Sequence, residues 1–136
     1  TTHVIAHLID LMPTFAAAAN VNDIQSEGMS LIPLLQGPNE SDAFTDREIG
    51  WEHEGNRAYR KGAWKIVSEF PGTWTTMYPY ANEGRWELYN MESDRTELNN
   101  LADSNPEKLI QMIESYEKWA DRVDVISWEN LEGKQE

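Results

Sequence analysis

The sequence contains no cysteine among its 136 residues. A disulfide framework, a thiolate zinc site and a cysteine nucleophile are therefore excluded within these residues. Basic residues are also scarce, because 11 Lys and Arg stand against 24 Asp and Glu and leave a formal net charge of −13. This charge repels nucleic-acid phosphates and anionic membrane surfaces, so we expect no nucleic-acid partner. We also expect no membrane insertion, since no apolar run approaches the ~18 residues that identify a transmembrane helix.

The first twenty residues are apolar and become helical partway along. Apolar residues over 4–9 predict a short strand, and the following "LMPTFAAAA" predicts a helix. We expect the Asp10 carboxylate to cap this helix, and Asn20 to end it in the left-handed conformation. The chain begins at Thr1 with neither a methionine nor a signal peptide, and its first forty residues offer the alanine-rich helix little to pack on. We expect the packing partner to lie in a missing upstream domain.

The next segments are a short helix and a polar connection. Residues 27–37, "EGMSLIPLLQG", predict a turn, a cap at Ser30 and one or two helical turns that stop at Gly37. Residues 38–46 are polar and contain Pro, Ser and Asp, which is typical of a linker.

From Arg47 onward the hydrophobic period changes to the two-residue period of strands. Turns are expected at Glu54-Gly55 and at Lys61-Gly62. The expected strands span residues 47–53, 56–60, 64–69 and 86–89.

A long helix is predicted over residues 104–123. Ser104 or Asn105 can cap it, Pro106 suits its first turn, and its apolar residues recur at helical spacing. The fold class is therefore α+β: a four-stranded antiparallel sheet packed by one long C-terminal helix, preceded by a strand and helix segment.

Few residues in this chain suit catalysis. His53 lies beside the first expected turn. It could take part in catalysis, and the alternative is a surface or structural role. Neighbours on a strand point to opposite faces, so Glu52, His53 and Glu54 do not converge on one ion, and we expect no metal site. Ser104, at a helix start where the dipole could activate it, is explained by capping alone. We therefore expect no catalytic residue in this chain.

The tryptophans allow two interpretations, a platform for a sugar or packing in the core and its rim. In a small domain, packing is the more common use of tryptophan. The six are Trp51, Trp64, Trp74, Trp86, Trp119 and Trp128.

Four segments, in order along the chain, resemble the sulfatase family. "HLIDLMPTFAAAANV" resembles the end of the sulfatase catalytic domain, although Asn20 stands where the family has glycine. "EGMSLIPLLQG" resembles the element that follows, with Glu27 in place of aspartate. "EHEGNRAYRKGAWKIV" and "WELYNMESDRTELNNLADSNPEKLIQM" resemble the hairpin and the signature run of the C-terminal subdomain. The resemblance is to the arylsulfatase A-like branch of the alkaline phosphatase superfamily.

This resemblance implies three parts of the chain. Residues 1–37 would be the end of an α/β catalytic domain, 38–46 a linker and 47–136 the C-terminal subdomain. The parent would be a sulfuric ester hydrolase that acts on an aryl or carbohydrate sulfate, with a formylglycine nucleophile and a calcium ion. The Cys/Ser-x-Pro-x-Arg motif that yields formylglycine does not occur here, so we expect the chain to be inactive alone.

The resemblance also implies partners and a location. The partner of this chain would be the missing catalytic domain of the same polypeptide, and the parent would be periplasmic or extracellular. Within the hairpin turn, His53, Asn56 and Arg57 would border the substrate. Two alternatives stay open, a non-catalytic carbohydrate-binding module and the C-terminal part of a related phosphodiesterase or phosphatase.

Overall fold

The structure, a computed structural model, describes residues 4–21, 23–37, 44–70, 84–128 and 130. Two compact units divide the chain, residues 1–47 and residues 48–136. The boundaries of the three predicted parts stay a prediction, and most of the predicted linker, residues 38–43, lies outside the described residues.

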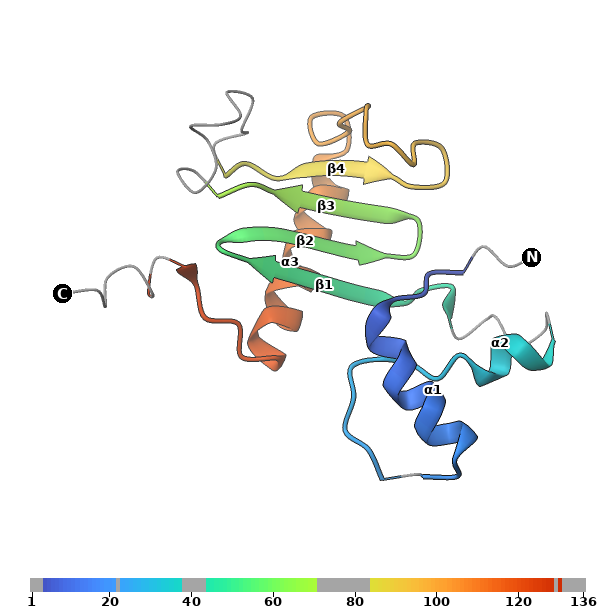
Figure 1. Cartoon of the computed structure of the whole chain (residues 1–136). Helices are drawn as coiled ribbons and strands as arrows, with labels where there is room; N and C mark the ends of the chain where they lie inside the picture. Colours follow the sequence, from blue (N-terminus) through green and yellow to red (C-terminus); the bar gives the residue numbers. More distant parts are fainter. Residues whose placement is uncertain (1–3, 22, 38–43, 71–83, 129, 131–136) are drawn as a thin grey trace. The chain divides into compact units, whose positions relative to one another are not determined.

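The first unit is a pair of helices joined by an irregular segment (Figure 1). A 3₁₀ turn, η1 (Leu8–Asp10), leads directly into α1 (Leu11–Ala18), and α2 (Ile32–Gln36) follows. Residues 4–7, where a strand was expected, form no regular secondary structure. A strand needs a neighbour to pair its backbone groups, and the described part of this unit contains no strand.

The end of α1 is as predicted. Asn20 has a φ of 57°, in the left-handed region. The Val21 N–H donates to the Ala16 carbonyl at 2.8 Å, and the Asn20 N–H donates to the Ala17 carbonyl at 3.1 Å. These two bonds form the Schellman motif that satisfies the last carbonyls of a helix. The predicted stop of the second helix at Gly37 is also confirmed.

The second unit contains a four-stranded antiparallel sheet in the order β1-β2-β3-β4, which confirms the predicted fold class (Figure 1). Each strand is hydrogen-bonded to its neighbour in the chain, so short connections suffice. The first tight turn lies at the predicted Glu54-Gly55, whose φ values of 52° and 81° are those of a type I′ hairpin turn. The strands are β1 (Glu48–His53), β2 (Asn56–Lys61), β3 (Trp64–Ser68) and β4 (Glu87–Asn90).

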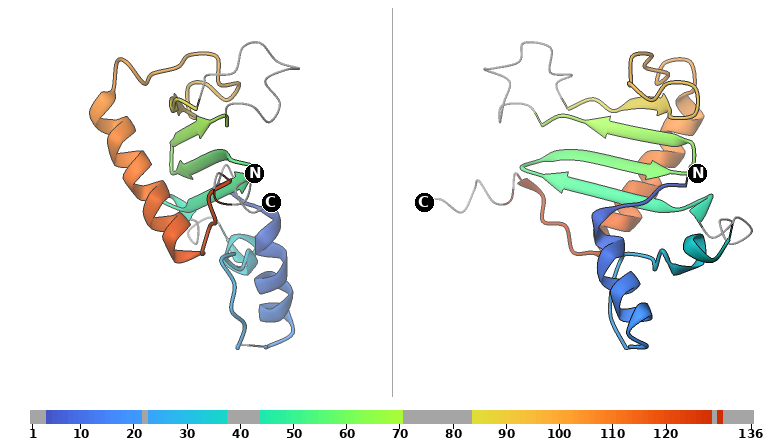
Figure 2. Two further views of the ribbon diagram at one scale, coloured as in Figure 1. Left: turned by 90° about the vertical axis from the view of Figure 1, so that its left-hand side faces the viewer. Right: turned by 45° about the vertical axis from the view of Figure 1, so that its right-hand side comes forward.

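One long helix, α3 (Pro106–Arg122), covers one face of this sheet (Figure 2). It brings the buried Met112 and Tyr116 against Tyr59 of β2, Ile66 of β3 and Leu88 of β4. Asn105 holds the predicted cap position, but its side chain donates to the Leu101 carbonyl instead of capping. Asn105 therefore occupies the predicted cap position, but its side chain does not make the predicted capping hydrogen bond.

Half of the six tryptophans pack against the core. Trp64, Trp86 and Trp119 pack against the buried cluster, which favours the packing interpretation for these three. Trp74 lies outside the described residues.

Candidate functional site

Asp10, the expected cap of α1, has a different role. Its carboxylate makes no capping bond to α1. It accepts instead from the backbone N–H of His7 at 2.7 Å and of Met29 at 2.9 Å, and it forms a bidentate ion pair with Arg47. Asp10 itself has helical backbone angles, whereas a capping residue is normally extended. The cap prediction for Asp10 is therefore wrong, and the residue ties together three separate segments.

The segment that resembles the catalytic-domain end is held by the same network. Thr14 donates its hydroxyl to the Asp10 carbonyl at 2.6 Å and accepts the Leu31 N–H at 2.8 Å. A Cβ at Gly28 would lie 2.1 Å from the Ile9 carbonyl oxygen, which leaves room for glycine alone. The first two of the four motif segments are thus bound to each other.

The signature run after β4 has a structural role of the same kind. The buried Asp94 accepts from the Asn99 N–H at 2.8 Å and from the Thr96 hydroxyl at 3.3 Å. Backbone N–H bonds, chiefly from Asn99, outweigh desolvation and hold the pKa of Asp94 below its ordinary value. Asn100 accepts from the N–H groups of Leu88 and Ala102, at 3.1 and 2.9 Å. The run therefore fixes the loop between β4 and α3.

The three residues predicted to border a substrate do not share one face of the sheet. His53 and Asn56 are cross-strand partners, whereas Arg57 pairs with Glu52, one position along each strand. Since side chains alternate along a strand, Arg57 points to the face opposite that of His53 and Asn56. His53 is exposed, and the Asn56 amide donates to the His53 carbonyl at 3.0 Å.

Arg57 lies on the face that α3 covers. Its guanidinium group lies over the Trp86 ring, 4.7 Å from the ring centroid, and its Nη2 donates to the Ser68 hydroxyl at 3.1 Å. The Nε of Arg57 is buried and has no hydrogen-bond partner among the described residues. Arg57 is thus a half-buried cation with hydrogen-bonding capacity left over.

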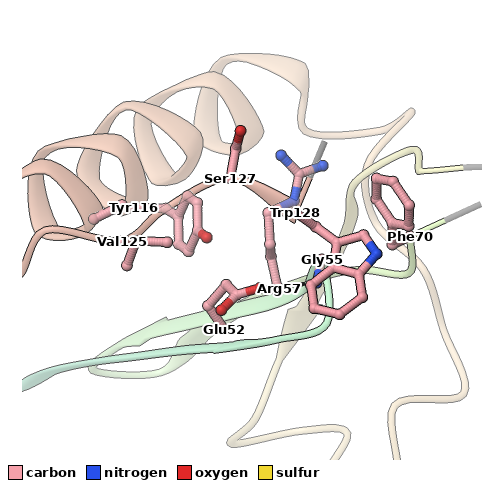
Figure 3. A pocket seen from close by; sticks show the side chains of 9 residues that line it. Glu52, Gly55, Arg57, Phe70, Tyr116, Val125, Ser127 and Trp128 are labelled. Atoms are coloured by element: carbon pink, nitrogen blue, oxygen red, sulfur yellow. Dashed lines mark hydrogen bonds between the residues drawn. The ribbon is translucent and has the colours of Figure 1, made fainter. Parts of the chain in front are cut away.

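A pocket of about 150 Å³ opens beside Arg57 (Figure 3). The first hairpin contributes one wall, α3 contributes a second, and the segment that follows α3 contributes the third. Its lining combines two charged side chains, a serine hydroxyl and three aromatic rings with small residues. The lining residues are Glu52, Gly55, Arg57, Phe70, Tyr116, Ala120, Val125, Ser127 and Trp128.

The two charged side chains of this pocket, Glu52 and Arg57, belong to cross-strand partners. Glu52 accepts the Gly55 N–H at 2.8 Å, which keeps its carboxylate beside the turn. In Figure 3 the Arg57 side chain rises from the hairpin toward the segment that carries Ser127 and Trp128. Burial raises the pKa of the Tyr116 hydroxyl, the Glu52 carboxylate raises it further, and Arg57 opposes both. Tyr116 is therefore a neutral wall of the pocket.

The sequence did not predict this pocket, although two of its lining residues were candidates, Arg57 at the substrate border and Trp128 in a possible sugar platform. Its walls come from residues 52–57, 70, 116–120 and 125–128, which are far apart along the chain. The one available signal was the alternation of side chains on β2, which separates Arg57 from Asn56.

Metal-ligand side chains do not cluster in the described part of the chain. No three His, Asp or Glu side chains come together there in a way that could hold one. The residues present therefore do not fit the calcium ion that the resemblance implies. Within the described ranges, none of the helices combines the length and the apolar character that crossing a bilayer requires.

Comparison with known proteins confirms the resemblance to sulfatases. No protein-family profile matches the chain. A segment of 68 residues, 48% of the chain, is 38% identical to an uncharacterized sulfatase of Schizosaccharomyces pombe. That segment is 10% of the yeast protein, so the chain spans only a small part of the length of this relative.

Solved structures agree over more of the chain. The crystal structure of Ps i-CgsB in complex with a neocarrahexaose matches 82% of the chain with a TM-score of 0.61 and 26% identity. A Bacteroides thetaiotaomicron structure, described for the metabolism of multiple glycosaminoglycans, matches 80% with a TM-score of 0.60 and 24% identity. The chain covers 23% and 24% of these two proteins. It is similar to the C-terminal part of sulfatases in both sequence and fold.

Proposed function

We propose that this chain, which resembles the C-terminal part of sulfatases, serves a longer enzyme that hydrolyses sulfate esters. The observation that carries the proposal is the 38% identity to a yeast sulfatase over 68 residues, together with the fold shared with Ps i-CgsB. Within that enzyme the second unit would support the catalytic domain and border the substrate.

The exposed apolar surface of the first unit supports the proposal that this unit binds a large partner. Leu8, Leu11, Met12 and Phe15 are exposed by 76, 41, 53 and 68%. Their spacing along η1 and α1 places them on one stripe. Exposed apolar stripes of this kind mark interfaces, and the partner we propose is the catalytic domain of the same polypeptide.

The chemistry of ester cleavage would come from that domain. The chain has no cysteine, and its described residues hold no candidate metal cluster. In this proposal, residues outside this chain hold the calcium ion and supply the formylglycine. Both groups, like a periplasmic or extracellular location, stay predictions for the parent.

A carbohydrate sulfate is the substrate class that we favour over an aryl sulfate. The support is the likeness to Ps i-CgsB, whose structure holds a neocarrahexaose. In this proposal the exposed His53, at the end of β1, contacts the sugar part of the substrate.

Hydrolysis by the full-length parent tests the proposal. We expect release of sulfate from carrageenan oligosaccharides or sulfated glucosamine, and little release of phosphate from the matching phosphate esters. Loss of one hydrogen bond at His53 should lower kcat/KM about tenfold in His53→Ala. The matched control is Lys61→Ala, at the far end of the same hairpin, which should keep its kcat/KM. A parent that cleaves phosphate esters but no sulfate ester would refute the sulfatase proposal.

A further inference from the structure

The pocket beside Arg57 has the size of a single six-membered ring. Cavities of about 150 Å³ in other proteins accept one benzene molecule. The pocket here has the same volume and is open at the surface of the second unit. The pocket therefore has room for a small ring or for one ring of a larger chain.

We propose that this pocket binds one monosaccharide unit that carries a carboxylate or sulfate group. Such a unit presents an anionic oxygen, several hydroxyl groups and the apolar face of its ring. Each of these three features has a counterpart in the lining.

Arg57 would take the anionic group. One of its nitrogens already donates to Ser68, and its plane lies on Trp86, so the guanidinium group is fixed in position. Its buried Nε has no partner among the described residues, although buried donors are nearly always paired. Because this Nε is closed to solvent, an anionic oxygen in the pocket would pair instead with the terminal nitrogens of Arg57, whose donors are only partly used by Ser68, through charge-assisted hydrogen bonds.

The rest of the lining favours a sugar over a plain aromatic acid. The Tyr116, Phe70 and Trp128 rings offer apolar surface for the face of a pyranose. The Glu52 carboxylate and the Ser127 hydroxyl can accept hydrogen bonds from ring hydroxyls, which benzoate lacks. Because the Glu52 carboxylate only accepts hydrogen bonds and repels a second negative charge, it suits hydroxyls rather than the anion.

This inference does not depend on the proposed hydrolase activity. It concerns binding by the 136-residue chain, which can be measured in the absence of any catalytic domain. Failure of sulfate-ester hydrolysis by the parent would leave it standing, and failure of binding would leave the hydrolase proposal standing.

Titration of the ¹⁵N-labelled chain followed by NMR tests the inference. The probes are glucuronate, glucosamine 6-sulfate, glucose, benzoate and inorganic sulfate. We expect the two anionic sugars to shift the signals of Gly55, Ser127 and the Trp128 indole, with Kd on the order of 1 mM. Glucose, benzoate and inorganic sulfate should bind at least about tenfold more weakly, because each lacks at least one of the matched features.

Three variants locate the site. Arg57→Gln should weaken binding of both anionic sugars about tenfold or more. The matched control is Arg60→Gln, which changes the same residue type on the same strand but on the opposite face of the sheet. Ala120→Leu fills the pocket without removing a charge, so it should abolish binding while the chain stays folded by its thermal midpoint.

Each outcome decides the question. Signal shifts confined to the pocket and lost in Ala120→Leu support the inference even if Arg57→Gln does not fold. The inference would be overturned if neither anionic sugar, at up to ~50 mM, shifted the signals of Gly55, Ser127 or Trp128. Binding about fiftyfold weaker than expected would not indicate a specific site. If glucose bound as tightly as the anionic sugars, the role of Arg57 would be wrong. The same would follow if Arg57→Gln bound the anionic sugars as tightly as the unchanged chain does.

Discussion

Among single residues, Asp10 and Arg47 form the ion pair most removed from solvent among those described. Their side chains are exposed by 0 and 2%, whereas those of Glu48 and Lys61 in the second unit are each exposed by 42%. Removing one partner of a buried pair leaves a charge without compensation and costs about 3–5 kcal/mol. We expect a loss of this size in the unfolding free energy of Asp10→Ala, measured by urea denaturation.

The exposed pair supplies the control for that measurement. Glu48→Ala should cost less than about 1 kcal/mol, because water replaces the lost contact. Similar losses in Asp10→Ala and Glu48→Ala would contradict the role assigned to the buried pair.

The same carboxylate should make stability depend on pH. Desolvation alone would raise the pKa of Asp10, but hydrogen bonds from Arg47, Met29 and His7 lower it below its ordinary value. A carboxylate with a lowered folded-state pKa stabilises the fold above its unfolded-state pKa of about 4, and this contribution is lost as the pH falls below that value. The stability difference between the native chain and Asp10→Asn should therefore be largest near pH 7 and should narrow below about pH 4. A difference that is constant from pH 7 to pH 2 would show that Asp10 does not titrate in this way.

Asn100 is the second residue whose side chain holds the backbone in place. Its Oδ1 accepts from the N–H of Leu88 in the core strand β4 and from the N–H of Ala102. Asn100→Ala leaves the Leu88 donor without this partner, so we expect a loss of about 1–3 kcal/mol in thermal or urea unfolding. Ser104→Ala is the control, because its hydroxyl makes an exposed bond to the Leu101 carbonyl and should cost under about 0.5 kcal/mol.

At the scale of elements, the contact between β1 and α3 requires a residue without a side chain at position 50 of β1. A Cβ on Gly50 would lie 2.3 Å from the Trp119 ring, closer than any real contact. Gly50→Ala should therefore destabilise the second unit by about 1–3 kcal/mol, as overpacking does elsewhere. Combining it with Trp119→Leu should recover part of this loss, and a double mutant whose loss equals the sum of the single losses would contradict the steric account.

Periodicity predicted these elements because each strand and the long helix carry their own pattern. Alternation over residues 48–68 and helical spacing over 106–122 both reflect burial of one face, which the sequence records locally. Asp10 was misassigned for the opposite reason. Its partners Met29 and Arg47 are 19 and 37 positions away, and a local pattern does not reveal them.

The candidate site was predicted only in part for a similar reason. The residues of the hairpin turn predict its place at Glu54-Gly55, but they do not show that His53, Asn56 and Arg57 differ in the direction of their side chains. Strand alternation divides them between two faces, and only the packing of distant segments gives Arg57 its neighbours Trp86, just before β4, and Tyr116, on α3. Adjacent sequence positions are therefore poor guides to which side chains of a hairpin act together.

For the molecule as a whole, the two units differ in how much of their apolar surface is buried. In the second unit a sheet and a helix enclose a cluster of five buried residues. In the first unit most of the apolar side chains of η1 and α1 are exposed. An apolar stripe in water promotes association until a partner covers it.

This difference predicts the behaviour of the isolated chain. We expect the 136-residue chain to self-associate at concentrations of about 0.1 mM in light scattering, because its stripe has no catalytic domain to bind. The double variant Met12→Glu/Phe15→Glu should be monomeric, since both side chains lie on that stripe and both are more than half exposed. Leu98→Glu is the matched control, because Leu98 is 79% exposed but belongs to the second unit, and it should leave association unchanged.

In the full-length parent the double variant Met12→Glu/Phe15→Glu should lower the yield of folded enzyme, because the charges would then face the catalytic domain. A parent that tolerates both charges without loss would mean that the stripe does not form that interface.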